Sequence, residues 1–243
     1  MAQASETCRL MERWKRILIG VNMSFFIIEG PNGAGKTELI KRIGNELECL
    51  SFSSPNGTKL SLELRPIARG VGDWNCLDSF TKFLLFSAAR YEEYLNLVHD
   101  KAKDDLIVCD RWWTSTFVYQ CCEGDVPVSS LECTIHPDEK ISGIILLDAK
   151  DDVLWERVRS ERIKNISHGN CSWTNEKEKL VNIASIYRKE FIPYIVDKKI
   201  PLIKIDTTDI DPDNVFNKSV DFMNNERIKN GCCKITHRTI KGS

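Results

Sequence analysis

The sequence predicts a doubly wound α/β fold, with a mostly parallel five-stranded sheet flanked by helices. Four short aliphatic runs with polar flanks have the length and composition of parallel strands that are buried on both faces. Between these runs lie longer segments in which apolar residues recur three or four positions apart, the spacing typical of helices. Strands and helices therefore alternate along the chain, as they do in α/β proteins.

The expected elements can be placed in chain order. The strands are expected at 24–29, more faintly at 50–53, and at 106–110, 143–148 and 201–206. The helices are expected at 36–49, 77–103, 151–164 and 174–198, with a C-terminal helix after residue 210. In 77–103 the periodic residues are Leu77, Phe80, Leu84, Ala88, Tyr91, Leu95 and Val98.

The length of 243 residues predicts one compact domain. Its core is expected over 23–210, because the first strand begins directly after Met23. Residues 1–22 are then an N-terminal extension, and 211–243 hold the C-terminal helix and a flexible tail. The polar stretch 164–173 is typical both of a mobile lid and of an ordinary surface connection. We expect a small lid near 156–175.

The composition excludes several classes of partner. The formal net charge of −1 gives no reason to expect binding to nucleic acid or an anionic membrane, and no window resembles a membrane span. Residues 1–22 lack the apolar centre of a signal peptide. The ten cysteines include no Cys-x-x-Cys motif. We therefore expect a cytoplasmic protein whose cysteines are reduced and mostly buried.

A phosphate-binding loop follows the first expected strand. The sequence "GPNGAGKT" fits the pattern G-x-x-x-x-G-K-[ST], between an apolar strand and a helix. Small residues let backbone N–H groups turn inward around an anion, and the start of the helix adds its positive end. Lysine reaches the β- and γ-phosphates, and threonine ligates Mg²⁺. The residues expected to bind ATP are Gly30, Pro31, Asn32, Gly33, Ala34, Gly35, Lys36 and Thr37.

The strand "LIVCD" ends in a second candidate site. Its last residue, Asp110, has the position of a carboxylate beside the Mg²⁺ of a P-loop site, although strand-terminal Asp residues are often helix caps. Arg111 follows at the carboxyl end of the strand, where ligands bind in open α/β sheets. The pair predicts that Asp110 faces the metal ion, as Thr37 does, while Arg111 faces a second anion.

With these motifs the chain resembles the thymidylate kinases, P-loop enzymes that transfer the γ-phosphoryl group of ATP to dTMP. The resemblance covers about residues 23–210 and is specific in three segments, "FFIIEGPNGAGKT" (25–37), "LLFSAARYEEY" (84–94) and "DRWWTSTFVYQ" (110–120). It implies Mg²⁺ as cofactor and a homodimer. It also implies that catalysis rests on Lys36 and Asp110.

The resemblance assigns roles in the acceptor pocket. Phe86 stacks on the base, where plain core packing is the alternative, and Arg90 donates hydrogen bonds to the base. Arg111 binds the acceptor phosphate, and Tyr119 packs against the sugar and disfavours a 2′-hydroxyl. The remaining residues of the expected pocket are Asn32, Ser115 and Gln120.

The resemblance also implies a source for a catalytic arginine. Family members without an arginine in the P-loop supply it from the lid, and the loop here reads Gly33-Ala34-Gly35. An arginine over the transferring phosphoryl group stabilises the charge that develops there. The segment 156–164 contains Arg157, Arg159 and Arg162. We expect Arg159 or Arg162 to act, and a solvated helix face is the alternative.

The chain departs from the family pattern at several positions. Asn32 stands where an acidic residue usually binds the sugar 3′-hydroxyl, and asparagine can accept the same hydrogen bond without charge. Ser53 stands where an arginine usually grips the acceptor phosphate, which leaves Arg65 or Arg69 as possible replacements. The two residues after the Asp-Arg pair, Trp112 and Trp113, are bulkier than usual.

Three other functions compete with a dTMP kinase. A deoxynucleoside kinase needs a general base for a neutral 5′-hydroxyl, and the stretch 50–57, "LSFSSPNG", offers no carboxylate. A kinase for another deoxynucleoside monophosphate remains open. A non-catalytic nucleotide sensor would not need Lys36, Thr37, Asp110 and a lid arginine together.

Overall fold

The computed structural model describes residues 23–99, 105–137, 139–165 and 173–238. The expected N-terminal extension 1–22 and the segment 166–172 within the expected lid lie outside the described residues. The sheet has five parallel strands in the order β2-β3-β1-β4-β5. The strands are β1 (Ser24–Glu29), β2 (Leu50–Ser53), β3 (Leu106–Asp110), β4 (Gly143–Asp148) and β5 (Leu202–Asp206). The predicted fold class is confirmed, including the faint second strand.

The helices alternate with the strands, as the sequence predicts. The principal α-helices are α2 (Lys36–Glu46), α3 (Lys59–Ala68), α4 (Ser79–Glu93), α7 (Asp151–Asn165), α8 (Trp173–Ile186), α9 (Ile192–Asp197) and α10 (Pro212–Lys229). Shorter helical segments are η1 (Gly72–Trp74), η2 (Tyr94–Val98), α5 (Trp113–Thr116), η3 (Phe117–Cys122), α6 (Val128–Glu132) and η4 (Tyr187–Phe191). The helix predicted at 36–49 ends three residues early, because Leu47 takes an extended backbone conformation before β2. The segments α3, α5 and α6 were not predicted.

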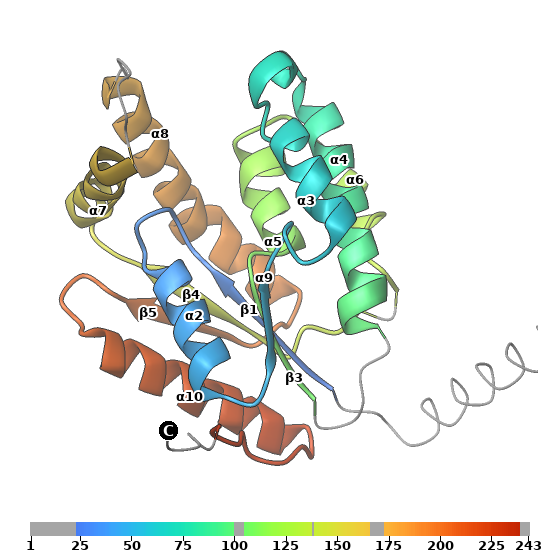
Figure 1. Cartoon of the computed structure of the whole chain (residues 1–243), viewed down its shortest axis with the longest axis vertical. Coiled ribbons are helices and arrows are strands. Elements are labelled where there is room, and N and C mark those ends of the chain that lie inside the picture. Colours follow the sequence, from blue (N-terminus) through green and yellow to red (C-terminus); the bar gives the residue numbers. More distant parts are fainter. Residues whose placement is uncertain (1–22, 100–104, 138, 166–172, 239–243) are drawn as a thin grey trace, which may run out of the picture.

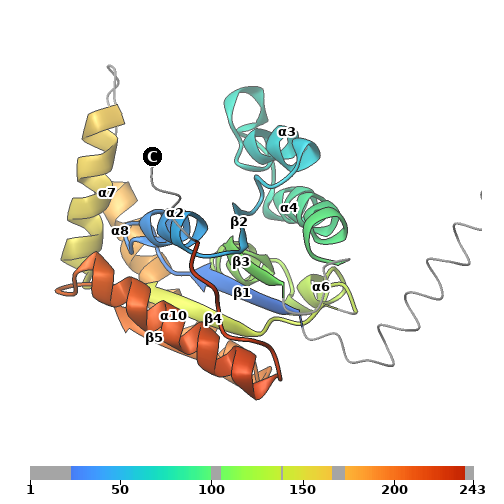
Figure 2. The same cartoon turned by 60° about the horizontal axis from the view of Figure 1, so that its bottom comes forward.

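Each face of the sheet has its own core, because successive side chains of a strand point to opposite faces. Phe25 and Ile27 of β1 pack with α4, η3, α8 and η4 on one face. Phe26 and Ile28 pack with α2 and α10 on the other face. Figure 2 shows α10 running along β4 and β5, and α3 beside α4 at the other end of the molecule. Burial on both faces thus explains why β1 and β4 are apolar from their second position up to their final acid.

The apolar stripe that predicts the helix at 77–103 faces outward in this chain. Phe80, Leu84, Tyr91 and Leu95 are each more than two-fifths exposed. The buried side of α4 instead carries Phe83 and several polar residues, among them Ser87, Arg90 and Glu93. The apolar period therefore identified the helix but not the face that packs on the core. Residues 100–103 of the predicted helix lie outside the described residues.

Two expectations, one about the cysteines and one about the C-terminal tail, need correction. None of the eight described cysteines is in a disulfide, as expected, but only Cys109 and Cys232 are buried, so the expectation of mostly buried cysteines is wrong. The tail is fixed beyond α10, because His237 forms an antiparallel bridge with Leu47. Residues 239–243 lie outside the described part of the chain.

None of the described helices combines the length and apolar character needed to cross a membrane.

Candidate active site

The candidate active site lies where the carboxyl ends of β1, β2 and β3 meet. The register pairs Ile28 of β1 and Ser53 of β2 with Asp110 of β3, so the three strand ends are adjacent. Ligands of open α/β sheets bind at this edge. The loop from β1 to α2 lies here, with α7 and α8 extending past the sheet on one side and α3 and α4 on the other (Figure 1).

The phosphate loop depends on glycine at the positions where it turns. Gly30 has φ 141°, and a Cβ atom there would lie 2.0 Å from the carbonyl oxygen of Leu147 in β4. Gly33 has φ 82°, and its Cβ would lie 2.6 Å from the carbonyl oxygen of Leu154 in α7. A side chain at either position would therefore require both a strained backbone and a displaced neighbour. The loop is held against β4 and α7, which places the start of α2 at the sheet edge.

Lys36 lies inside this loop and is nearly fully buried. Its Nζ donates to the carbonyl oxygen of Pro31 at 2.8 Å. Burial and, to a smaller extent, the nearby positive charge of Arg111 together lower the pKa of Lys36 to about 7, against the opposing effect of Asp110. The ammonium group is thus positioned for an anion whose negative charge would stabilise its protonated form.

Binding of ATP is expected to take up protons above neutral pH. At about pH 8 the Lys36 amine of the free protein is largely neutral, since its pKa is about 7, and the triphosphate raises that pKa. At about pH 6 the amine is already charged, so uptake is small. Calorimetry in buffers of different ionisation enthalpy measures the uptake. Equal uptake by Lys36→Ala would contradict this assignment.

Asp110 carries a carboxylate oxygen without a partner. The residue is 9% exposed, and its Oδ1 has no hydrogen-bond partner among the described residues. Its Oδ2 accepts a long hydrogen bond of 3.4 Å from Ser53 Oγ. A buried carboxylate oxygen is costly without a donor or a cation. Asp110 is therefore a side chain to which a bound cation would supply the missing partner, rather than a helix cap.

Arg111 connects the phosphate loop with the acceptor pocket. Its backbone is left-handed, with φ 68°. One guanidinium nitrogen donates to Asn32 Oδ1 at 2.8 Å, and the other donates to Ser115 Oγ at 3.2 Å. The guanidinium also lies over the ring of Tyr119, 5.4 Å from its centre. Residues predicted from two motifs are thus brought together: Asn32 from the phosphate loop, and Arg111, Ser115 and Tyr119 from the segment 110–120.

Glu29, which the sequence analysis did not select, lies beneath Arg111. It is the last residue of β1 and is fully buried. Its carboxylate accepts hydrogen bonds from Thr114 Oγ1 at 2.6 Å, from Ser115 Oγ at 2.8 Å and from Tyr187 OH at 2.7 Å. The signal that could have identified it is a single acid at the end of an apolar run, directly before the phosphate loop.

The acceptor helix α4 presents Arg90 from its buried side. One Arg90 nitrogen donates to Thr116 Oγ1 at 2.7 Å and another donates to Ser87 Oγ at 3.2 Å. Burial lowers the pKa of Arg90 to about 10, against the charges of Glu139 and Glu93, so it stays protonated near neutral pH. The other predicted pocket residues, Phe86 and Gln120, are half-buried.

The loop after β2 is fixed by Glu93 of α4. This carboxylate is fully buried and accepts from Ser54 Oγ at 2.5 Å and from the backbone N–H groups of Asn56 and Gly57 at 2.7 and 2.6 Å. Arg65, on the helix that follows, is half-buried. Burial and Arg69 lower its pKa, and the charges of Asp110 and Arg111 also act on it. The charge of Arg65 therefore interacts with those of Asp110 and Arg111.

The helix before the lid contacts the phosphate loop through Arg157. Arg157 donates to the carbonyl oxygen of Gly33 at 3.2 Å and to that of Thr207 at 2.7 Å. Arg159 is half exposed and pairs loosely with Glu156 at 3.8 Å. The side chain of Arg162 lies outside the described residues. The assignment of a lid arginine to catalysis stays a prediction.

The two tryptophans after Arg111 belong to the core, not to the ligand pocket. Trp112 packs edge-on against Phe25, with ring centres 5.3 Å apart. The indole N–H groups of Trp112 and Trp113 donate to one oxygen of Glu139 at 2.6 and 2.8 Å. Burial raises the pKa of Glu139 to about 7. Their bulk therefore fills the space behind the acceptor site.

The fold and this site define a P-loop phosphotransferase. One lysine lies in a phosphate loop, and one arginine directly follows the neighbouring strand, where it could bind a second anion. The sequence model of the thymidylate kinase family matches residues 28–200, which is more than half of the chain. The chain therefore belongs to the thymidylate kinase family, whose members are ATP-dependent nucleoside monophosphate kinases.

Individual proteins support this assignment. A thymidylate kinase of Methylobacillus flagellatus is 31% identical over 147 residues, which are 57% of this chain and 70% of that protein. One of Staphylococcus epidermidis is 33% identical over 102 residues, which are 40% of this chain and 49% of that protein. The crystal structure of thymidylate kinase from Ehrlichia chaffeensis matches with a TM-score of 0.57 at 19% identity, over 82% of this chain and 98% of that one, and supports the fold.

Proposed function

We propose that this protein phosphorylates dTMP to the diphosphate with ATP as donor, for the synthesis of dTTP. The observation that supports the proposal most directly is the pairing of two cationic side chains across Asp110. Lys36 lies in the phosphate loop, and Arg111 lies at the end of the adjacent strand. One cation suits the triphosphate of the donor, and the other suits the phosphate of an acceptor. The sequence relatives named thymidylate kinase favour dTMP as that acceptor.

The surroundings of the acceptor site favour a monophosphate over a nucleoside. A nucleoside kinase must remove a proton from a neutral 5′-hydroxyl, which requires a free base. The fold brings two carboxylates of α4, Glu92 and Glu93, to the loop after β2. Glu92 already accepts from Thr58 Oγ1, and Glu93 is fully buried and already accepts from Ser54, Asn56 and Gly57. An acceptor phosphate is already anionic and needs no such base. The deoxynucleoside kinase alternative is therefore not favoured.

Magnesium fits the residues present. The unpartnered Asp110 Oδ1 offers an anionic oxygen ligand, and the exposed Thr37, the second residue of α2, offers a hydroxyl. Within the described residues no three His, Cys, Asp or Glu side chains cluster as a metal site would require. Mg²⁺ is commonly held by one or two carboxylates together with substrate phosphates, so a single Asp is compatible with it. The bound ion would neutralise charge that develops on the transferring phosphoryl group.

An acceptor panel tests the proposed reaction. Release of ADP is measured with ATP and Mg²⁺ and with either a deoxynucleoside or its monophosphate, for each of the common bases. We expect turnover with dTMP and no turnover with thymidine. Phosphorylation of thymidine but not of dTMP would overturn the proposal. Tight nucleotide binding without turnover of any acceptor would favour a sensor.

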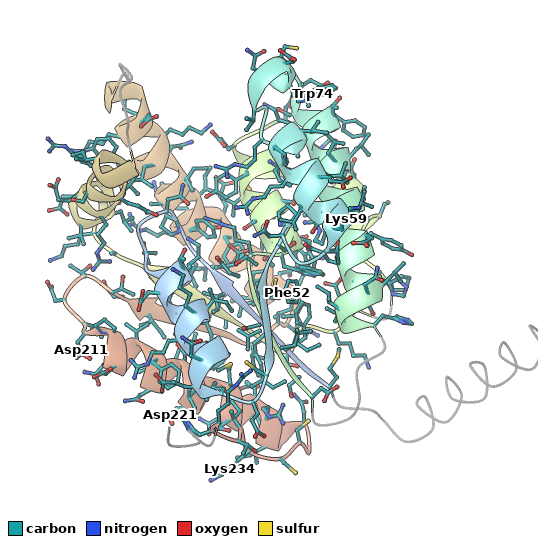
Figure 3. The ribbon with its side chains drawn as sticks, in the orientation of Figure 1. Phe52, Lys59, Trp74, Asp211, Asp221 and Lys234 are labelled. Atoms are coloured by element: carbon teal, nitrogen blue, oxygen red, sulfur yellow. The ribbon has the colours of Figure 1, made fainter. Side chains whose placement is uncertain are left out.

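We also propose that the protein forms a homodimer through the outer face of α4. Phe80, Leu84, Tyr91 and Leu95 form an exposed apolar stripe on α4 and η2, at helical spacing. Trp74 is 48% exposed and ends η1, the short helical segment after α3, at the outer tip of the molecule (Figure 3). A contiguous apolar surface of this kind usually marks an interface. A second copy would cover the stripe with its own, as in a two-fold symmetric dimer.

The dimer can be tested by placing one charge on this stripe. Leu84→Glu is expected to shift the sedimenting species from dimer to monomer at micromolar concentration, because an unpaired carboxylate would be buried at the interface. Ile228→Glu on α10 is the matched control, since Ile228 is 50% exposed and Leu84 is 49% exposed. A monomeric unmodified protein, or a Leu84→Glu protein that remains dimeric, would contradict the proposed interface.

A further inference from the structure

The charge of Glu29 has no direct use in phosphoryl transfer, and yet the chain buries it completely. The residue is 0% exposed at the end of β1. Removing a carboxylate from water is costly unless hydrogen bonds and an opposite charge compensate for it. Here Thr114, Ser115 and Tyr187 supply hydroxyl donors, the backbone N–H of Trp112 lies 3.3 Å away, and Arg111 lies at ion-pair distance, 3.8 Å.

Apart from that of Tyr187, these contacts fall on the turn that carries Arg111 and on the residues directly after it. The backbone of Arg111 is left-handed, a conformation that is unfavourable for a residue with a side chain. Its N–H donates to the carbonyl oxygen of Ile28, the residue before Glu29. The acid then receives hydrogen bonds from the residues that follow Arg111 in the turn. The end of β1 thus holds this turn at two places. Ile28 binds the backbone of Arg111, and Glu29 binds the residues that follow it.

Tyr187 connects this arrangement to the helix that follows the lid segment. Its hydroxyl donates to Glu29 Oε2 at 2.7 Å and accepts from an Arg111 nitrogen at 3.3 Å. The tyrosine is fully buried in η4, which continues directly from α8. Glu29 and Tyr187 therefore contact the same nitrogen of Arg111. The other guanidinium nitrogen bonds to Asn32, which is exposed.

We propose that Glu29 is a positioning residue for the acceptor phosphate. Together with Tyr187 it fixes the Arg111 guanidinium with one nitrogen engaged in the protein and the other directed to the ligand side. This inference rests on the proposed function, because it assigns the acceptor phosphate to Arg111. It adds that the affinity for this phosphate depends on a carboxylate that never touches it. A preformed arginine loses less side-chain freedom on binding than a mobile one, which increases affinity.

The test is a double-mutant cycle on the affinity for dTMP. Glu29→Gln keeps the shape of the side chain and removes its charge. We expect it to raise the KM for dTMP about tenfold to a hundredfold, the usual range for a hydrogen bond to a charged group. In an Arg111→Ala background the same change should alter the KM less than about twofold, because the effect acts through Arg111. Tyr187→Phe removes a single hydroxyl, and we expect a smaller increase of about threefold.

The control is a matched carboxylate on the next strand. Asp148 ends β4, is 4% exposed and pairs with Arg188. Asp148→Asn should leave the KM for dTMP unchanged. An equal effect of Glu29→Gln with and without Arg111, or an equal effect of Asp148→Asn, would overturn the inference in favour of general destabilisation. If Glu29→Gln does not fold, Tyr187→Phe takes its place in the cycle, and an equal effect on the KM for dTMP with and without Arg111 would overturn the inference.

Binding of dTMP and turnover of dTMP are measured separately, so that this inference and the proposed function can fail independently. The dissociation constant of dTMP, measured by calorimetry, needs no turnover and gives the same cycle. A protein that binds dTMP through Glu29 and Arg111 without phosphorylating it would overturn the function alone. An active kinase whose cycle shows additive effects would overturn the inference alone.

Discussion

Lys36→Ala and Asp110→Asn should each reduce turnover by about a hundredfold or more while the protein remains folded. Phosphoryl transfer depends on positioning and on stabilisation of charge, and removing one preorganised group of this kind has an effect of that size. Lys36 is directed into the phosphate loop by its bond to Pro31. Asp110→Asn keeps the volume of the side chain and removes the negative charge from its unpartnered Oδ1, which we propose as the Mg²⁺ ligand.

The measurement is steady-state ADP release together with a thermal unfolding curve for each variant. Raising the Mg²⁺ concentration should partly restore Asp110→Asn but not Lys36→Ala, since only the first loses a metal ligand. A correctly folded Lys36→Ala protein with near-normal turnover would show that the phosphate loop does not hold the reacting nucleotide.

Arg111→Ala should raise the KM for the acceptor and lower kcat/KM for it by about a hundredfold or more, the range for truncating a buried charged contact. Ser53 stands where the resemblance leads us to expect a second arginine, and its hydroxyl contacts Asp110 instead. Arg111 therefore bears an unusual share of phosphate binding, and Arg65 of α3 is a second arginine whose charge interacts with Asp110 and Arg111. Arg111→Lys should restore little, because the paired donors of guanidinium are lost.

The lid arginines provide the contrast to Arg111. If Arg159 or Arg162 stabilises the transition state, its replacement by alanine should lower kcat and kcat/KM together and change the acceptor KM little. Arg157 is already bound to Gly33 and Thr207, so Arg157→Ala should act mainly on the KM for ATP. Full activity in both Arg159→Ala and Arg162→Ala would mean that the charge at the phosphoryl group comes from elsewhere. A normal acceptor KM in Arg111→Ala would show that Arg111 does not bind the acceptor phosphate.

The sequence by itself determined the order of strands and helices, the phosphate loop and the Asp110–Arg111 pair. These features are local, because buried strands, glycine turns and strand-terminal acids each leave a pattern within a few consecutive residues. The family resemblance then placed Arg90 on the acceptor helix, and the structure buries Arg90 on the inner side of α4. Local patterns could not indicate which side of α4 is inner, because its most regular apolar stripe is the exposed one.

Only the tertiary structure decided which distant groups meet. Glu29 and Tyr187 are 158 positions apart and share a hydrogen bond, and Glu93 reaches the loop after β2 from the middle of another helix. Arg157, not Arg159, contacts the phosphate loop, although the two are neighbours on one helix. Trp112 and Trp113, which looked like changes in the ligand pocket, pack behind it. The physical reason is that a buried charge needs partners from several elements, and which elements supply them depends on how the chain packs.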